Sequence, residues 1–176
     1  MLDPCPVGVV RAYRPRNDFM VPVVPSVAPT SLPIATSTGR FVAIRLKPGM
    51  DLIAGLREVQ HQTGARAIGV VTCVGSLTSV PIRHANQPEG TLYQGHFEIT
   101  SLTGTVDPLG EHLHLTITDG EGRAFGGHLL PGSAVYTTAE IVLLLLDDLS
   151  FARMPCPASG YDELVVHRVT QPQDRS

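Results

Sequence analysis

Apolar and polar residues alternate along most of the chain after its first forty positions, which is the pattern of strands with one buried face. Turn residues such as Pro, Gly, Asp and Asn separate the alternating segments. We therefore predict strands over residues 41–46, 66–75, 80–84, 93–106, 112–118, 123–130, 135–146 and 164–169. Within them, Gly95 and Gly104 are expected kinks, and Pro81 is typical of an edge strand or a bulge. The run 135–146 lacks a decisive period, but its β-branched residues favour a strand over a buried helix.

One segment has helical periodicity instead. Asp51 is suited to cap the first turn, and Gly64 to end the helix. The apolar face between them consists of Leu52, Ile53, Leu56 and Val59. One helix among about eight strands joined mostly by short loops predicts an α+β domain whose sheet is mainly antiparallel, with the helix packed on it.

The ends of the chain differ from this central domain. Seven prolines lie within residues 1–38, namely Pro4, Pro6, Pro15, Pro22, Pro25, Pro29 and Pro33. Proline disfavours helix and removes backbone donors, so we predict an extended or disordered arm over 1–38, although an ordered arm along another subunit is an alternative. The compact domain is expected over 39–170, followed by a tail over 171–176.

Composition narrows the classes of function. The chain has 13 Lys and Arg against 16 Asp and Glu, a net charge of −3, so it has no overall positive field for nucleic acid or an anionic membrane. Its three cysteines have no C-x-x-C spacing, which argues against a disulfide framework or a cysteine zinc site. No apolar run approaches the length of a membrane span, and we expect a cytoplasmic protein.

Three of the seven histidines fall in one expected hairpin, 112–130. His112 and His114 project from the same face of a strand because side chains alternate. His128 joins them only if paired positions sum to an even number, as 114 with 128 does. A loop of three residues, or of five over 119–123, gives that register, whereas a four-residue loop turns His128 away.

In the even register, His112, His114 and His128 would supply three nitrogen ligands with a fourth position open. That set is typical of zinc, while nickel and iron also accept nitrogen. Glu98 or Glu111 would orient an imidazole or act as a base. The alternative is that the histidines are polar residues of a solvated or subunit-facing strand. For Glu98, the first interpretation is an ion pair with Arg83 or Arg123, and a catalytic role comes second.

Several short segments, taken in order, resemble one known family. They are Gly75-Ser76-Leu77-Thr78-Ser79-Val80, the segment 95–104 (GHFEITSLTG), His112-x-His114, Asp119-x-x-Gly122-Arg123, Gly126-Gly127-His128-Leu129 and Gly160-Tyr161-x-Glu163-Leu164. Through these segments, the chain from Arg40 to about Val169 resembles the plants-and-prokaryotes-conserved (PPC) domain, which occurs in plant AT-hook nuclear proteins and in stand-alone bacterial and archaeal proteins.

The resemblance implies a compact unit with a curved antiparallel sheet and a helix against it, associated as a homotrimer. In plant members the domain mediates contacts with itself and with protein partners, while a separate AT-hook with an Arg-Gly-Arg-Pro core enters DNA. This sequence contains no such core, and it has His96 where the plant pattern has arginine. DNA is thus a weakly supported partner.

Two functions follow as hypotheses. The first is a trimeric DNA-associated or regulatory protein that acts through oligomerisation and partner contacts and binds a divalent metal, zinc being expected, through the histidine cluster. The alternative is a small metal-dependent enzyme, a hydrolase or lyase, acting on a small-molecule substrate.

Overall fold

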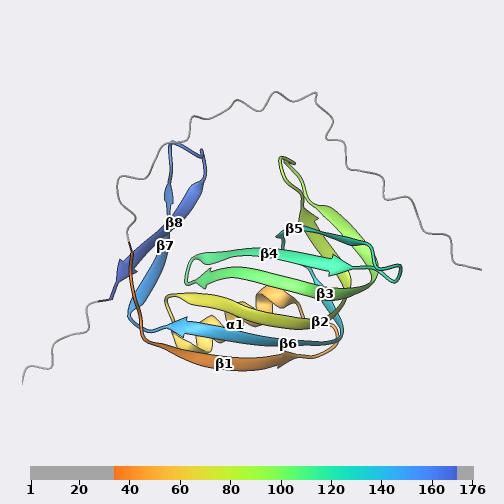
Figure 1. Cartoon of the computed structure of the whole chain (residues 1–176), viewed down its shortest axis with the longest axis horizontal. Coiled ribbons are helices and arrows are strands. Elements are labelled where there is room, and N and C mark those ends of the chain that lie inside the picture. The colour runs from red at the N-terminus through yellow and green to blue at the C-terminus, as the bar shows by residue number, and fades with distance from the viewer. Residues whose placement is uncertain (1–33, 170–176) are drawn as a thin grey trace, which may run out of the picture. The chain divides into compact units, whose positions relative to one another are not determined.

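The computed structural model describes residues 34–169, in which one helix and eight strands occur (Figure 1). In chain order they are β1 (Gly39–Leu46), α1 (Leu52–Thr63), β2 (Ile68–Arg83), β3 (Thr91–Asp107), β4 (Gly110–Thr118), β5 (Ala124–Leu129), β6 (Ala134–Leu146), β7 (Leu149–Pro155) and β8 (Asp162–Arg168). The arm predicted over 1–38 lies outside the described residues except for 34–38, and the tail 171–176 lies outside them entirely.

Six strands form one antiparallel sheet in the order β1-β6-β2-β3-β4-β5. The end of β2 also pairs with β5, where Ile82 lies opposite Leu129 and Arg83 opposite His128. The pairings of β2, β3, β4 and β5 therefore close into a ring, which makes this end of the sheet strongly curved. The predicted fold class, a curved antiparallel sheet with one helix, is confirmed.

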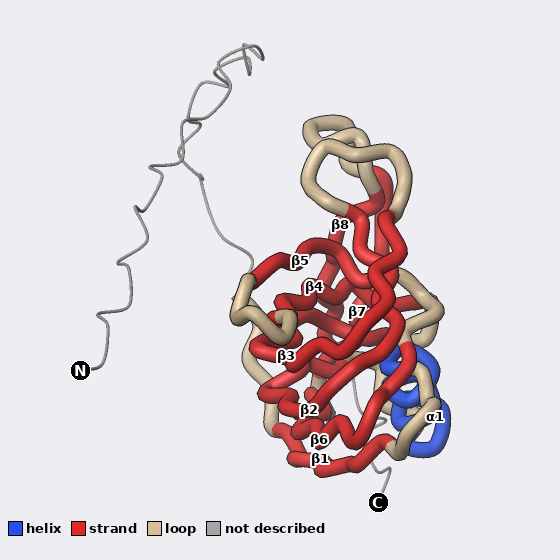
Figure 2. The backbone as a smooth tube through the Cα atoms, turned by 90° about the vertical axis from the view of Figure 1, so that its right-hand side faces the viewer, coloured by secondary structure: helices blue, strands red, loops and turns tan. Residues whose placement is uncertain are grey.

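Helix α1 begins and ends where the sequence predicts. The carboxylate of Asp51 accepts a hydrogen bond from the Ala54 amide at 2.7 Å, and Gly64 ends the helix with a φ of 65°. The apolar face of α1 lies in the core with the buried side chains of β4, Leu113, Leu115 and Ile117. Figure 2 shows the helix on one side of the strands. Residues that alternate with the buried ones on β4 consequently face away from α1.

The strands predicted over 66–75 and 80–84 are one continuous strand, β2, which corrects the expected break. A shift in register between Leu77 and Ser79 gives a bulge where the sequence indicated a loop. Pro81 is tolerated although β2 is a central strand, because the pairing to β6 ends at Ser79 and the pairing to β5 begins at Ile82.

Strand β7 was not predicted, and β8 does not complete the main sheet. These two strands pair with each other as a separate two-stranded sheet, from Leu149 opposite Arg168 to Pro155 opposite Asp162. Figure 1 shows this hairpin standing at the left of the main sheet, beyond the end of β6. Within residues 34–169, no helix is long and apolar enough to cross a membrane.

Candidate metal site

The hairpin of β4 and β5 has the register that brings three histidines to one face. His114 lies opposite His128, and the last pair, Thr118 with Ala124, leaves a loop of five residues, 119–123. Because His112 precedes His114 by two positions, its ring projects from the same face. The condition set by the sequence, an even register, is therefore met by the five-residue loop.

The side chain of Asp119 stabilises this five-residue loop. One oxygen of its carboxylate accepts hydrogen bonds from the amides of Glu121 and Arg123, both at 3.0 Å. The other oxygen accepts from the Arg123 guanidinium at 2.7 Å. These bonds satisfy the backbone donors of the turn, and they fix the register on which the histidine face depends.

Glycines seat the neighbouring strands close to the histidines. A Cβ on Gly104 would lie 1.9 Å from the His112 carbonyl oxygen, and one on Gly126 would lie 2.2 Å from the Leu115 carbonyl oxygen. A Cβ on Gly127 would lie 2.7 Å from the Arg83 carbonyl oxygen. The Gly126-Gly127 pair therefore lets β5 approach β4 and β2 together, which places His128 between His114 and Arg83.

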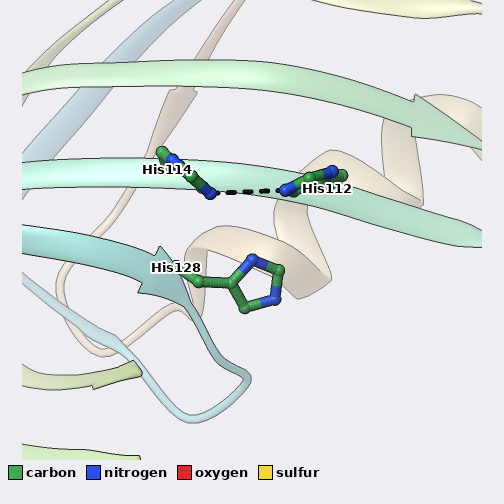
Figure 3. A group of neighbouring side chains, drawn as sticks. All are labelled: His112, His114 and His128. Atoms are coloured by element: carbon green, nitrogen blue, oxygen red, sulfur yellow. Dashed lines mark hydrogen bonds between the residues drawn. The ribbon is translucent and has the colours of Figure 1, made fainter. Parts of the chain in front are cut away.

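The three rings converge to metal-binding distances. The Nε2 atoms of His112 and His114 are 3.3 Å apart, and Figure 3 shows the His128 ring, from β5, turned toward them. One ligand nitrogen from each ring lies within 4.8 Å of the others. Zinc–nitrogen bonds of about 2.0–2.1 Å in a tetrahedron place nitrogens about 3.3 Å apart. The pair on β4 has this spacing, and a ligand nitrogen of His128 lies within 4.8 Å of both.

Burial and neighbouring charge lower the pKa of two of the three imidazoles, His112 and His128. Burial lowers the pKa of His112 below its ordinary value, and the charges of His114, Arg153 and Arg83 lower it further, against an opposing effect of Glu163. Burial also lowers the pKa of His128, with Arg83 as the next cause. A neutral imidazole is the form that binds a metal, so this environment favours ligation near neutral pH.

Of the two carboxylates expected to support the cluster, one lies far from it and the other is paired with a residue of α1. Glu98 is opposite Thr118, four positions along β4 from His114, which is roughly 13 Å at the usual strand rise. Glu111 forms an ion pair of 2.6 Å with Arg57 of α1. The expected ion pair of Glu98 with Arg83 or Arg123 is also wrong for the described residues, in which Arg123 pairs with Asp119 and Glu121 instead.

The histidines outside the hairpin do not join the cluster. His84 lies with Nδ1 3.1 Å from the Gly126 carbonyl oxygen, and its Nε2 contacts the Tyr93 hydroxyl. His96 packs on Tyr136, with ring centres 4.4 Å apart. Each of these two rings therefore has a structural contact that accounts for its position.

A cavity of about 690 Å³ opens beside the cluster, and the sequence did not indicate it. Its lining residues come from five strands and two turns: Arg83, Leu109, Gly110, Glu111, His112, His128, Arg153, Tyr161, Asp162 and Glu163. Arg83 reaches the site through the long-range pairing of β2 with β5, and Arg153 through the unpredicted strand β7, so no local pattern could have identified them.

Two curated proteins share part of their sequence with this chain. The bifunctional protein GlmU of Synechococcus sp. (strain JA-3-3Ab) is 42% identical over 139 residues, covering 79% of this chain and 22% of that protein. AT-hook motif nuclear-localized protein 13 of Arabidopsis thaliana is 36% identical over 96 residues, covering 48% of this chain and 21% of that protein. The chain thus spans about a fifth of the length of these relatives.

Solved structures have the same fold. A hypothetical protein from Salmonella cholerae-suis superposes with a TM-score of 0.75 at 45% identity, over 76% of this chain and 97% of that one. A metal-containing protein from Archaeoglobus fulgidus superposes with a TM-score of 0.62 at 25% identity, over 75% of this chain and 99% of that one.

The family model for the Plants and Prokaryotes Conserved (PCC) domain matches residues 34–147. This match includes the main sheet, α1 and all three clustered histidines, whereas the Gly160 to Leu164 segment of the predicted resemblance lies beyond it. The likeness to the plant AT-hook proteins and the shared fold agree with the motifs in the sequence. The chain belongs to the Plants and Prokaryotes Conserved domain family.

Proposed function

We propose that this protein binds one divalent metal ion, zinc, through His112, His114 and His128. The observation that carries the proposal is the convergence of three imidazole nitrogens within 4.8 Å on a rigid hairpin. Three nitrogen ligands leave a fourth tetrahedral position for water or a ligand, which is the arrangement of zinc sites that bind or transform small molecules. The similar Archaeoglobus fulgidus protein is described as metal-containing, which supports the same reading.

Metal analysis tests the proposal directly. The purified protein is expected to contain about one zinc per chain by elemental analysis, and His128→Gln is expected to lose it. His61→Gln is the matched control, because His61 lies in the last turn of α1 and outside the cluster. Equal metal content in the two variants would assign the metal to other residues, and a metal-free wild type that takes up no zinc would reject the site.

We further propose that the protein acts as a homotrimer through contacts with itself and with protein partners. Apolar side chains are exposed on three adjacent strands: Phe41 of β1, Val71 and Val74 of β2, and Tyr136 of β6. Such a surface is typical of a protein interface. Sedimentation should give the mass of a trimer for the wild type and a smaller mass for Val74→Lys. Leu92→Lys is the control. Leu92 lies on β3, outside this set of residues, and its side chain is about as exposed as that of Val74, 57% against 56%.

If the protein acts at DNA, a partner would supply most of the affinity. The net charge is −3, and the sequence lacks the Arg-Gly-Arg-Pro core of an AT-hook. We expect little duplex binding at physiological salt, with a steep loss as salt rises. Residues 1–38 include three closely spaced arginines, Arg11, Arg14 and Arg16. Removing this segment should weaken any residual binding if these arginines contribute, and unchanged binding would exclude the segment.

A second candidate function is metal-dependent hydrolysis or elimination on a small molecule. The observation that favours it is the cavity of about 690 Å³ that includes His112 and His128 in its lining. A zinc ion supplies Lewis acidity at such a site. The candidate base is now Glu163, which lines the same cavity. Glu98 lies too far along the strand, and Glu111 is paired with Arg57. Turnover of small esters that is lost in both His128→Gln and Glu163→Gln, but not in His61→Gln, would establish an enzyme.

A further inference from the structure

The cavity beside the histidines has an uneven distribution of charge. Arg83, on the end of β2, and Arg153, on β7, bring two guanidinium groups to it. Asp162 and Glu163, at the start of β8, supply carboxylates from the hairpin. The site therefore offers positive charge next to the histidines and negative charge from β8.

The ion pairs leave one of these guanidinium groups available. Arg57 neutralises Glu111 at 2.6 Å, and Arg153 lies 3.8 Å from the buried carboxylate of Asp107 while also donating to Thr105 at 3.0 Å. Among the described residues, Arg83 has no ion pair. A half-buried arginine without a carboxylate partner carries a cost in solvation that an anionic ligand would offset.

The position of Arg83 is fixed relative to the proposed metal. The β2–β5 pairing sets Arg83 directly opposite His128, and Gly127 allows that approach because a side chain there would meet the Arg83 carbonyl oxygen. A metal ion and Arg83 would thus act on the same end of the cavity.

We propose that Arg83 anchors a carboxylate or phosphate group of a small molecule next to the metal, an inference that rests on the metal site proposed above. Guanidinium groups bind both anions through paired hydrogen bonds. The carboxylates of Asp162 and Glu163 disfavour ligands with several negative charges, such as a nucleic acid backbone. The ligand class is therefore a small molecule with one anionic group.

Calorimetric titration of the zinc-loaded protein with inorganic phosphate, and separately with acetate, tests this assignment. We expect millimolar or tighter binding of at least one anion, and a loss of about tenfold or more in Arg83→Gln, since a hydrogen bond to a charged group contributes about 1.5–3 kcal/mol. Comparison of the two titrations tells whether the site prefers phosphate or carboxylate.

Arg45→Gln is the matched control, because Arg45, on β1, donates a hydrogen bond to Thr138 of β6 and does not line this cavity. Equal affinities in Arg83→Gln and Arg45→Gln, or no binding of either anion by the wild type, would overturn the inference. Arg83→Lys is the second variant. It retains the charge and should recover part of the affinity if the anion contacts residue 83, and an affinity no better than that of Arg83→Gln would count against the contact.

The zinc content of each sample separates this inference from the metal proposal. Full zinc content without a difference between Arg83→Gln and wild type rejects only the anion site. A wild type that takes up no zinc rejects the metal site. In that case the same titrations of metal-free protein decide whether Arg83 alone binds the anion. An Arg83→Gln variant with the anion affinity of the wild type would reject the anion site as well.

Discussion

Replacing Gly104 by alanine should separate β3 from β4 at His112. An alanine Cβ would lie 1.9 Å from the His112 carbonyl oxygen, and a carbon and an oxygen normally approach to about 3.3 Å. The strands would then have to move apart locally by the difference, about 1.4 Å. Gly104 also has a φ of 136°, a backbone conformation that is strained for a residue with a side chain.

The expected cost follows from these two effects. Backbone strain contributes about 1–3 kcal/mol and overpacking about 1–3 kcal/mol, so Gly104→Ala should lower the free energy of unfolding by about 2–6 kcal/mol. The proposed zinc affinity should also fall by about 10–100-fold, because metal–ligand distances tolerate only about 0.2 Å. Urea denaturation and competition with a zinc chelator measure the two quantities.

Gly69→Ala is the matched control. Gly69 also lies in a strand, but nothing is within 4 Å of the Cβ that alanine would add. Its free energy of unfolding should change by less than about 1 kcal/mol, and zinc affinity should not change. A Gly104→Ala protein with the stability and zinc affinity of Gly69→Ala would refute the claim that this close approach positions His112.

Three further outcomes are expected. Chelation should lower the melting temperature of the zinc-loaded wild type by on the order of 10 °C, since a ligand at 100 times its Kd contributes about 2.7 kcal/mol, but should not change that of His128→Gln. Asp148→Asn should lower the melting temperature at pH 7, and the difference from the wild type should shrink as the pH falls below the unfolded-state pKa. The hydroxyl and amide of Thr38 lower the pKa of Asp148, so its contribution is present above the unfolded-state pKa and is lost as the pH falls through the folded one. Alkylation at pH 8, followed by mass spectrometry of peptides, should modify Cys156 before Cys73, because burial raises the pKa of Cys73 to about 11 while hydrogen bonds from Ser159 and Ala158 lower that of Cys156; equal rates would contradict this order.

Local patterns were sufficient for the elements whose causes are local. Asp51 and Gly64 bound α1 as predicted because capping involves only neighbouring residues. The alternation of β4 likewise assigned Leu113 and Leu115 to the core and His112 and His114 to the other face. The sequence alone allowed loops of three, four or five residues in the hairpin, and the hydrogen bonds of Asp119 explain why five is adopted.

Long-range pairing is where prediction from the sequence failed. The bulge at Leu77 to Ser79 keeps β2 continuous because β3 and β6 pair with it from both sides. Strand β7 is short, and its last residue, Pro155, together with the Cys156-Pro157 that follows, masks its strand pattern. Glu98 was misplaced for a related reason, since its distance from the histidines depends on the register of β3 against β4.

The same long-range contacts decide what the histidine cluster can bind. The hairpin alone would present three imidazoles on an open strand face, which is equally suited to a solvated surface. Pairing of β5 with β2 adds Arg83 beside His128, and the β7–β8 hairpin adds Arg153 and Glu163 as another wall. A metal held by these histidines would therefore lie beside a cavity lined by charged groups. Selectivity for a ligand should therefore depend on Arg83 and on the β7–β8 hairpin, whereas metal affinity should depend on the β4–β5 hairpin and the glycines that seat it.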